Sequence, residues 1–305
     1  MKPAEFAYHR PGGVSAAVAL LAGLGDDARV LGGGQSLVPD LNTRRITPRH
    51  LVGITGIGSL RGARKMAGGV RYGATTTHQM VEDGLVPDAA GGLLARAAAG
   101  IGHRAVRTRG TLGGSLAYAD PAAEWPTVFA ALDATVEVCG ARGVRSFPAR
   151  ELPLSAFRSA LAADEIIVAV DVHRLPPGRW WGLHKTAGAK GAWAASLAVV
   201  LFDIDERGTL CAVTLWLGAA RDTPVQLPAT ELLLTGRRAA GLDVAAVLPG
   251  VAQDLGTVEG VSDDTARHTL RVHAATVCRA LARAERAGRS SGTGRSSGTE
   301  GTGAS

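Results

Sequence analysis

The chain has 305 residues, which is long for one domain, so we expect two or three units around one or two cores. Its 33 lysines and arginines against 27 aspartates and glutamates give a net charge of +6, and no aromatic stacking series accompanies the scattered basic residues, which argues against nucleic-acid binding. Three distant cysteines, Cys139, Cys211 and Cys278, indicate reduced thiols in a cytoplasmic protein and exclude a disulfide framework and a CxxC metal or iron–sulfur site.

No segment of the sequence predicts a membrane span or a secretory signal. A spanning helix needs about 18 apolar residues, and the longest clean candidate, "AWAASLAVVLF" (192–202), is far shorter. The stretch "MKPAEFAYHRPGG" carries early charges and no apolar signal core, so we expect no signal peptide.

The first half of the chain alternates predicted helices and strands. A helix is predicted where apolar residues share one face before two glycines: Val14, Val18 and Leu21, then Gly23 and Gly25. The same patterns predict a strand at 28–32, a helix of small residues at 91–101, a helix followed by a strand within 125–140, and an alternating strand at 164–174.

After the linker "LPPG" (175–178), the pattern changes to two long strands and several helices. Segments 192–205 and 208–220 resemble neighbouring strands joined by a turn at 205–208. Helices are predicted around 227–235 and over 264–286, the latter with one apolar face formed by Leu270, Ala274, Val277, Leu281 and Ala284. Residues 287–305 have a Gly/Ser/Thr composition that predicts disorder.

The stretch "VLGGGQSLVP" (30–39) places three glycines after a predicted strand. Glycine reaches positive φ and lets an anion approach the backbone N–H groups closely, and Ser36 adds a hydroxyl donor. The stretch is neither a GxGxxG fingerprint nor a P-loop. A tight turn between strand and helix is the alternative interpretation.

A second glycine-rich stretch, "RGTLGGSLAYADP" (109–121), contains Thr111 beside two glycines. Two separate loops of this kind are suited to holding the two phosphates of a pyrophosphate from either side. Asp120 and Glu124 follow, and carboxylates near a dinucleotide accept hydrogen bonds from ribose hydroxyls. Asp120 before Pro121 is alternatively a helix cap, and Glu124 an ordinary acid of a first helical turn. The preceding basic cluster, "HRAVRTR" (103–109), indicates a solvated face or an anion or partner contact.

Together, "GGGQSLVPDLNTR", "YGATTTH", "IGHRAVRTRGTLGGSLAYADPAAEWPTVFAALDA" and "DEIIVAV" resemble the FAD-binding subunits of molybdenum hydroxylases, the family of the carbon monoxide dehydrogenase medium subunit and the xanthine dehydrogenase flavin domain. The resemblance covers about 1–286 in family order. It implies an α+β chain with a vanillyl-alcohol-oxidase (PCMH)-type FAD-binding domain at 1–176, in two α/β subdomains (about 1–55 and 56–176). A C-terminal α+β domain with an antiparallel sheet follows at 180–286, then the tail at 287–305.

The resemblance also implies the residues that bind FAD. The first pyrophosphate loop matches Gly32, Gly33, Gly34, Gln35 and Ser36, with Leu37 beside it, and the second matches Thr111, Gly113, Gly114 and Ser115. Glu124 matches an acid at the adenosine ribose, with Asp120 near the same part of the FAD. Ile167 matches an apolar residue against the isoalloxazine, and Lys185 a lysine near the polar edge of the flavin, where positive charge favours the reduced anion.

Several positions depart from the family pattern. Ser115 and Thr108 stand where relatives have asparagine, and both keep a polar group. His184 replaces a common tyrosine, while Ala189 and Ala192 replace an arginine and an aspartate. The changes at 184–192 bear on flavin potential, electron acceptor or subunit docking. Gln35, where covalent flavoproteins of this fold often carry histidine, implies non-covalent FAD.

The implied function is electron transfer within a cytoplasmic hetero-oligomer, a dimer of heterotrimers. A large partner subunit with a molybdenum cofactor hydroxylates the substrate, and a small partner with two [2Fe–2S] clusters relays electrons to this FAD. Each cluster usually takes four cysteines, more than this chain holds. We therefore expect no catalytic residue and no metal ligand in the chain itself.

Two other interpretations stay open. A stand-alone FAD oxidoreductase of the same fold, such as a cell-wall enolpyruvyl reductase type, would need a pocket acid and a proton donor. An assembly subunit that has lost FAD is the other, and the six glycines of the two loops argue against it.

Overall fold

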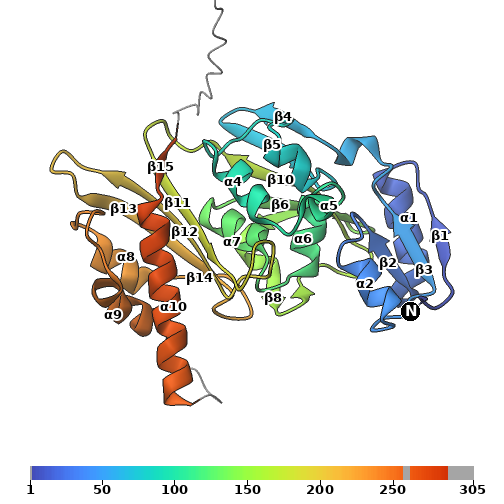
Figure 1. Ribbon diagram of the computed structural model, residues 1–305. Helices are drawn as coiled ribbons and strands as arrows, with labels where there is room; N and C mark the ends of the chain where they lie inside the picture. Colours follow the sequence, from blue (N-terminus) through green and yellow to red (C-terminus); the bar gives the residue numbers. More distant parts are fainter. Residues whose placement is uncertain (1, 257–261, 288–305) are drawn as a thin grey trace, which may run out of the picture.

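The computed structural model describes residues 2–256 and 262–287, and three main sheets follow one another from one end of the molecule to the other (Figure 1). The tail predicted to be disordered lies, apart from Ala287, outside the described residues. Within the described part of the chain, no helix is long and apolar enough to cross a membrane.

The first sheet is parallel, with strand order β1-β3-β2, and lies at the N-terminal end. Its elements are β1 (Ala7–His9), α1 (Val14–Leu24), β2 (Ala28–Leu31), α2 (Leu37–Asn42) and β3 (His50–Gly53). Helix α1 buries the apolar face formed by Ala17, Val18 and Leu21. It ends at Gly25, whose φ of +56° favours glycine, so the predicted helix is confirmed.

The second sheet is antiparallel, with strand order β4-β5-β10-β6-β7. Its strands are β4 (Ala63–Met66), β5 (Gly69–Gly73), β6 (Thr135–Gly140), β7 (Gly143–Pro148) and β10 (Ile166–His173). The helices beside it are α3 (His78–Glu82), α4 (Leu93–Gly100), α5 (Arg104–Arg107), α6 (Leu112–Tyr118) and α7 (Glu124–Ala131), and Figure 1 shows them gathered in the middle of the molecule. A small hairpin, β8 (Pro153–Ser155) and β9 (Arg158–Ser159), completes this part.

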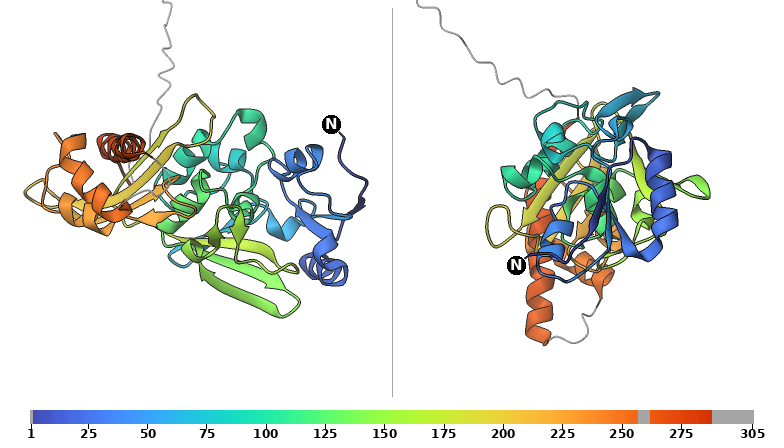
Figure 2. Two further views of the ribbon diagram at one scale, coloured as in Figure 1. Left: turned by 90° about the horizontal axis from the view of Figure 1, so that it is seen from below. Right: turned by 90° about the vertical axis from the view of Figure 1, so that its right-hand side faces the viewer.

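The third sheet has strand order β14-β13-β12-β11-β15 and is antiparallel. Its elements are β11 (Trp180–Thr186), β12 (Ser196–Ile204), β13 (Leu210–Gly218), β14 (Val225–Gln226), α8 (Pro228–Leu234), α9 (Val244–Leu255), α10 (Asp263–Ala282) and β15 (Glu285–Arg286). Figure 2 shows α10 on the outer side of this sheet, far from the first sheet. The turn at 205–208 joins β12 and β13 as predicted.

Strand β12 is buried on both faces, which explains its unbroken apolar sequence. Leu197, Val199 and Leu201 belong to the core shared with the second sheet and its helices. Alternate residues on the other face, Ala198, Val200 and Phe202, pack in the core beneath α8, α9 and α10. The third sheet is therefore joined to the second by a continuous core.

Two sequence predictions need correction near the C-terminus. The last helix ends at Ala282 rather than 286, because Glu285 and Arg286 pair with the edge of β11 as strand β15. Helix α9 was not predicted, since Pro249 and Gly250 interrupt its sequence. Gly250 is required because a Cβ there would lie 2.8 Å from the Thr230 Cα atom of α8.

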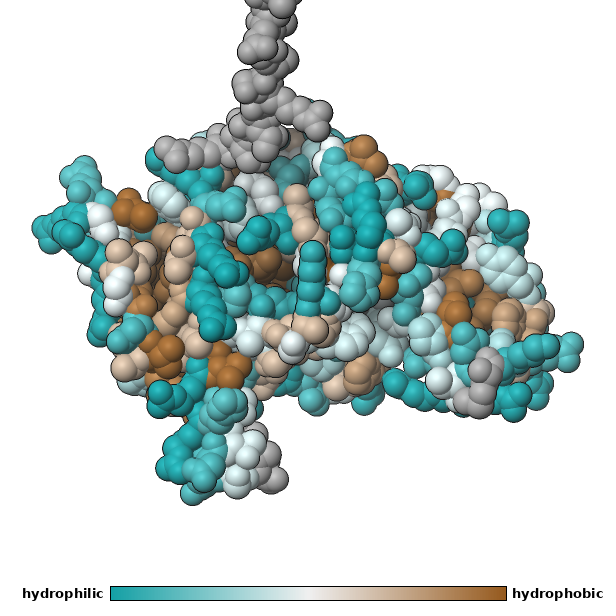
Figure 3. All heavy atoms as spheres, in the orientation of Figure 1, coloured by the Kyte–Doolittle hydropathy of each residue, from teal (hydrophilic) through white to brown (hydrophobic). Residues whose placement is uncertain are grey.

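The observed architecture confirms the predicted α+β fold, with a parallel and an antiparallel unit followed by an antiparallel C-terminal sheet. The predicted domain boundaries at 55–56 and 176–180 stay predictions. On the face shown in Figure 3, hydrophilic residues separate several small apolar groups, so no single extended apolar patch is visible there.

Candidate functional site

The first glycine loop connects β2 to α2 and offers a run of free backbone donors. None of the N–H groups of residues 33–37 donates a hydrogen bond to another residue in the described part of the chain. Gly34 has a φ of +75°, a conformation that side-chain-bearing residues rarely adopt. Consecutive free N–H groups in such a loop suit an anion, and the anion-binding role that the sequence analysis gives to this loop stays a prediction.

A pocket of about 360 Å³ opens at this loop. It is lined by Gly32, Gly33, Gly34 and Gln35, together with Tyr8, Leu31, Val38, Pro39, Asn42, Thr55 and Arg109. Arg109 comes from the second glycine-rich stretch, so a positively charged residue borders a pocket otherwise built from the first sheet and the segments that follow its strands. Ser36 and Leu37 follow in the chain, and Leu37 begins α2.

The two loops are in direct contact. A Cβ on Gly33 would collide with the carbonyl oxygen of Arg109 and lie 2.8 Å from the Gly110 Cα atom. A Cβ on Gly32 would lie 3.3 Å from the Thr111 hydroxyl oxygen. The helices that follow the loops are linked as well, because Tyr118 of α6 donates a hydrogen bond to Asp40 of α2 at 3.3 Å. Only a residue without a side chain permits this approach at Gly33.

The second loop uses its own backbone donors internally, unlike the first. Leu112 and Gly113 donate to the carbonyl oxygens of Thr76 and Ala74 at 3.0 and 2.9 Å. Gly114 donates to the Thr111 hydroxyl at 3.1 Å, which caps α6, and Ser115 donates to the Thr111 carbonyl. The sequence analysis predicts close ligand approach at these glycines, which stays a prediction, and the structure shows that they also allow tight packing inside the protein.

Packing around Gly113 and Gly114 supports this second role. A Cβ on Gly113 would lie 2.7 Å from the Ala74 side chain, and one on Gly114 would lie 2.7 Å from the Thr111 hydroxyl. What the second loop can still offer a ligand is side-chain chemistry: the hydroxyls of Thr111 and Ser115 and the guanidinium of Arg109.

Asp120 does not cap a helix. Its carboxylate accepts a hydrogen bond from the Ala122 N–H at 2.8 Å in a local turn, and the residue preceding α7 is Ala123. Burial raises the pKa of the Asp120 carboxyl, and the bond from Ala122 opposes this effect. Glu124, by contrast, is the first residue of α7, as the alternative interpretation expected.

Glu124 and Lys185 form a buried ion pair between the second and third sheets. The Lys185 ammonium lies 2.7 Å from a Glu124 carboxylate oxygen and donates to the Gly100 carbonyl at 2.9 Å. Burial raises the pKa of the Glu124 carboxyl, and the lysine partly offsets that rise. The resemblance placed these residues at the adenosine ribose and at the flavin, which are opposite parts of FAD, but the structure brings them together.

Ile167 lies in β10 with its side chain almost entirely within the core, at 4% exposure. Thr108 donates its hydroxyl hydrogen bond to the Ala105 carbonyl. His184, next to Lys185, contacts the Arg283 guanidinium at 2.9 Å, and burial together with Arg283 lowers the pKa of its ring to about 4.

The basic cluster at 103–109 divides into two parts. Arg104 and Arg107 pair with Glu82 on α3, and Arg104 also pairs with Asp83. Arg109 instead lines the pocket at the first loop. The sequence analysis did not single out Arg109 within the cluster, and nothing in its pattern pointed to the pocket residues Tyr8, Asn42 and Thr55.

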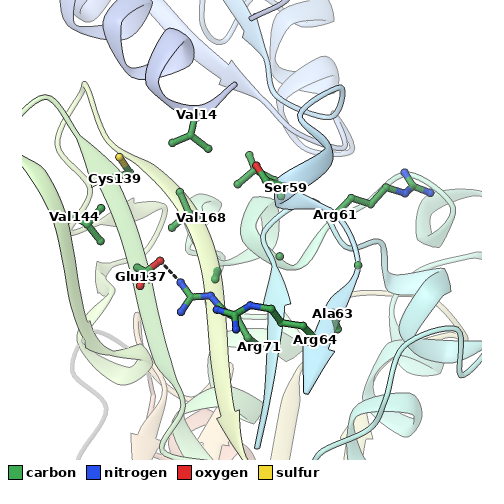
Figure 4. A pocket seen from close by; sticks show the side chains of 14 residues that line it. Val14, Ser59, Arg61, Ala63, Arg64, Arg71, Glu137, Cys139, Val144 and Val168 are labelled. Atoms are coloured by element: carbon green, nitrogen blue, oxygen red, sulfur yellow. Dashed lines mark hydrogen bonds and ion pairs between the residues drawn. The ribbon is translucent and has the colours of Figure 1, made fainter. Parts of the chain in front are cut away.

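A second concave region, of about 640 Å³, lies between α1 and the second sheet and contains none of the predicted residues. Figure 4 shows Arg64 and Arg71 side by side there, with Arg71 paired to Glu137. Arg71 also pairs with Asp171. The charge of Arg71 is thus matched within the protein. In the described part of the chain, no three histidine, cysteine or acidic residues are grouped as metal ligands.

Comparisons with known proteins identify the family of the chain. Residues 4–174 match the family described as the FAD binding domain in molybdopterin dehydrogenase. The chain is 36% identical over 284 residues to the 6-hydroxypseudooxynicotine dehydrogenase complex subunit alpha of Paenarthrobacter nicotinovorans, covering 93% of this chain and 96% of that protein. It is 37% identical over 202 residues to the carbon monoxide dehydrogenase medium chain of Hydrogenophaga pseudoflava, covering 66% and 70%.

Solved structures show the same likeness over nearly the whole chain. A chain of the carbon monoxide dehydrogenase of Hydrogenophaga pseudoflava superimposes with a TM-score of 0.84 at 32% identity, covering 93% of this chain and 98% of that one. A chain of quinoline 2-oxidoreductase from Pseudomonas putida 86 gives a TM-score of 0.83 at 30% identity, covering 92% and 97%.

Proposed function

This chain belongs to the family of FAD-binding domains of molybdopterin dehydrogenases, and we propose that it is the FAD-binding electron-transfer subunit of a molybdenum hydroxylase complex. Its relatives include subunits of dehydrogenase complexes that act on 6-hydroxypseudooxynicotine and carbon monoxide. The chain covers 96% of the 6-hydroxypseudooxynicotine dehydrogenase subunit and 98% of the superimposed carbon monoxide dehydrogenase chain, which supports a role like that of these subunits.

One observation carries the proposal: the run of free N–H groups at 33–37 lies against the second loop and beside Arg109. This donor set suits a pyrophosphate, because N–H groups and a guanidinium both bind phosphate oxygens. The residues present therefore fit FAD. Gly32, Gly33, Gly34, Gln35, Ser36 and Leu37 would hold the pyrophosphate from one side, with Thr111, Ser115 and Arg109 on the other.

We place the adenosine end of the FAD toward Tyr8, Asn42 and Thr55, and the flavin end toward the Glu124–Lys185 pair. The first group lines the pocket at the first sheet, whereas the ion pair lies at the junction with the third sheet. An extended dinucleotide held at its centre by the two loops would have its ends directed toward these two regions. This orientation assigns Glu124 to the flavin end rather than to the ribose, because its carboxylate is bound to Lys185.

FAD, when bound, supplies the redox chemistry, accepting electrons and passing them on. The protein binds the phosphates, shields the ring and sets the charge around it. Lys185 places a positive charge that favours the reduced, anionic flavin, and the neighbouring Glu124 moderates that charge. Ile167 and Asp120 stay predicted contacts, and Gln35 is consistent with non-covalent attachment.

The electrons would come from partner subunits. The three cysteines of this chain lie on β6, β13 and α10, and a [2Fe–2S] cluster is usually held by four. We therefore propose a small partner with two [2Fe–2S] clusters and a large partner with the molybdenum cofactor, assembled as a dimer of heterotrimers. Substrate choice would then belong to the large partner.

The test is to purify the chain from its native source and alone after recombinant expression. From the native source, we expect two further polypeptides to purify with the chain, together with flavin, iron and molybdenum in constant proportion. Acid treatment should release intact FAD. Alone, the chain should take up FAD and turn yellow. A colourless chain that takes up no FAD would favour the assembly-subunit interpretation. A yellow chain that oxidises a substrate without partners would favour a stand-alone oxidoreductase.

A further inference from the structure

Gly110 of the second loop lies between the first loop and a buried histidine. On one side, a Cβ on Gly33 would lie 2.8 Å from the Gly110 Cα atom. On the other, a Cβ on Gly110 would lie 2.7 Å from Nε2 of His78. The backbone N–H of His78 also donates to the Gly110 carbonyl at 3.0 Å. His78 thus packs against the second loop on the side opposite the first loop, at the residue where the two loops touch.

The ring of His78 is held in turn by Trp125. The Trp125 indole N–H lies 3.0 Å from Nδ1 of His78. Because an indole nitrogen only donates, Nδ1 must accept, and a neutral ring then carries its proton on Nε2, toward Gly110. Burial, with a smaller effect from Arg107, lowers the pKa of His78 to about 4, so the ring is neutral at physiological pH.

Trp125 connects this arrangement to the proposed flavin end. It follows Glu124 directly in α7, and its ring is stacked on Phe129 with centroids 5.2 Å apart. Trp125 and His78 are both buried, at 0% and 4% exposure. A continuous series of contacts therefore runs from Gly33 through Gly110 and His78 to Trp125, the residue next to Glu124 of the Glu124–Lys185 pair.

We propose that His78 is a positioning residue for the flavin cofactor, which acts through its hydrogen bond with Trp125 to set the spacing between the two glycine loops and the Glu124 carboxylate. His78 does not contact the cofactor. This proposal rests on the FAD-binding role proposed above. It requires that the side chain at position 78 accept a hydrogen bond from the Trp125 indole.

The test compares His78→Asn with His78→Leu, two side chains of similar shape, of which only asparagine offers an oxygen near the position of Nδ1. Loss of one buried hydrogen bond of this kind is worth about tenfold in binding. We expect His78→Leu and Trp125→Phe each to weaken FAD binding about tenfold and to shift the flavin absorption bands. His78→Asn should retain most of the wild-type affinity.

Two further readouts separate positioning from general loss of structure. The Trp125 indole N–H resonance should move in His78→Leu and stay near its wild-type position in His78→Asn. The double variant His78→Leu/Trp125→Phe should bind FAD no more weakly than either single variant, because both remove the same bond. Should His78→Leu fail to fold, Trp125→Phe and Gly110→Ala, which presses on His78 from the loop side, carry the test.

The inference fails if His78→Leu and Trp125→Phe, shown to be folded, bind FAD with wild-type affinity and spectrum. It also fails if His78→Asn is as impaired as His78→Leu. Failure of the wild-type chain itself to bind FAD is a different result, since it overturns the proposed function before any variant is compared.

Discussion

Lys185 of the C-terminal sheet places its ammonium 2.7 Å from the carboxylate of Glu124, the first residue of helix α7, which packs against β12 and β13. The side chains of Lys185 and Glu124 are only 15% and 6% exposed. A charge so little hydrated needs its partner, because desolvation disfavours an isolated ion. The C-terminal sheet therefore completes the charge arrangement at the proposed flavin site.

Lys185→Met should destabilise the chain by about 3–5 kcal/mol, because it leaves Glu124 buried without a cation. The remaining carboxyl, whose pKa burial already raises, should hold its proton in the folded state. The variant should then lose stability as pH rises above the ordinary pKa of a glutamate. Urea unfolding at several pH values measures this. In the control Glu124→Gln/Lys185→Met, that pH dependence should disappear; its persistence would contradict the assignment.

Gly33→Ala should weaken FAD binding by at least about tenfold, because the added Cβ pushes the Arg109 carbonyl away and separates the loops. Titration of the apoprotein with FAD measures the change. The matched control is Gly23→Ala, in helix α1, where an added Cβ meets nothing within 4 Å. That control should bind FAD normally and gain about 0.5–1 kcal/mol in stability. Equal FAD affinity in the two variants would show that FAD binding does not depend on the close contact between the loops at Gly33.

Arg109→Gln should weaken FAD binding by about tenfold, since hydrogen bonds to charged groups contribute about 1.5–3 kcal/mol. Added salt should reduce wild-type binding more than binding by the variant, because the lost contact is ionic. Arg61→Gln, which changes the other concave region, is the control and should leave FAD binding unchanged. An effect of Arg61→Gln alone would move the proposed site to that second region.

Thr111→Val should destabilise the chain by about 1 kcal/mol, because the hydroxyl accepts the Gly114 N–H at the start of α6. Thr111→Ser keeps this cap and should restore stability. Thermal unfolding of the apoproteins compares the two. Wild-type stability in Thr111→Val would mean that the cap contributes nothing to the loop.

Stability should fall as the solution is acidified from about pH 6.5 to 4. The pKa values of His78 and His273 are lowered to about 4 in the folded protein, mainly by burial, whereas the unfolded chain binds protons near the ordinary value of 6.5. The unfolded state thus takes up more protons than the folded state in this pH range. Protonation of each histidine therefore lowers the free energy of unfolding by on the order of 3 kcal/mol. Denaturant titrations at several pH values measure the free energy of unfolding. In the wild type, the His273 ring lies 2.8 Å from the Ser196 hydroxyl. In His273→Asn, the free energy of unfolding should fall less steeply as the pH is lowered. An unchanged slope would exclude His273 as a source.

Local patterns predicted the longer amphipathic and apolar elements, such as α1, β10, β12 and α10, whereas many short strands and helices were not predicted. The apolar face of α10 follows from its sequence, but its end does not, because Glu285 and Arg286 find a partner in β11. Helix α9 was missed because a proline and a glycine inside it are tolerated only through packing on α8. The first glycine loop has the free backbone donors that its sequence suggested, and its role in binding an anion stays a prediction.

By itself, the sequence determined the longer helices and strands, the two glycine loops and the likeness to flavin-binding subunits, since these depend on residue types and short spacings. Only the tertiary structure decided that the second loop uses its amides internally, that Glu124 meets Lys185, and that His78 supports Gly110. The partners in these contacts lie far apart in the chain or on neighbouring elements. The pairing of donors and acceptors is decided only when the sheets pack and exclude water. A buried polar group must then form its hydrogen bond with a group that the tertiary structure places nearby.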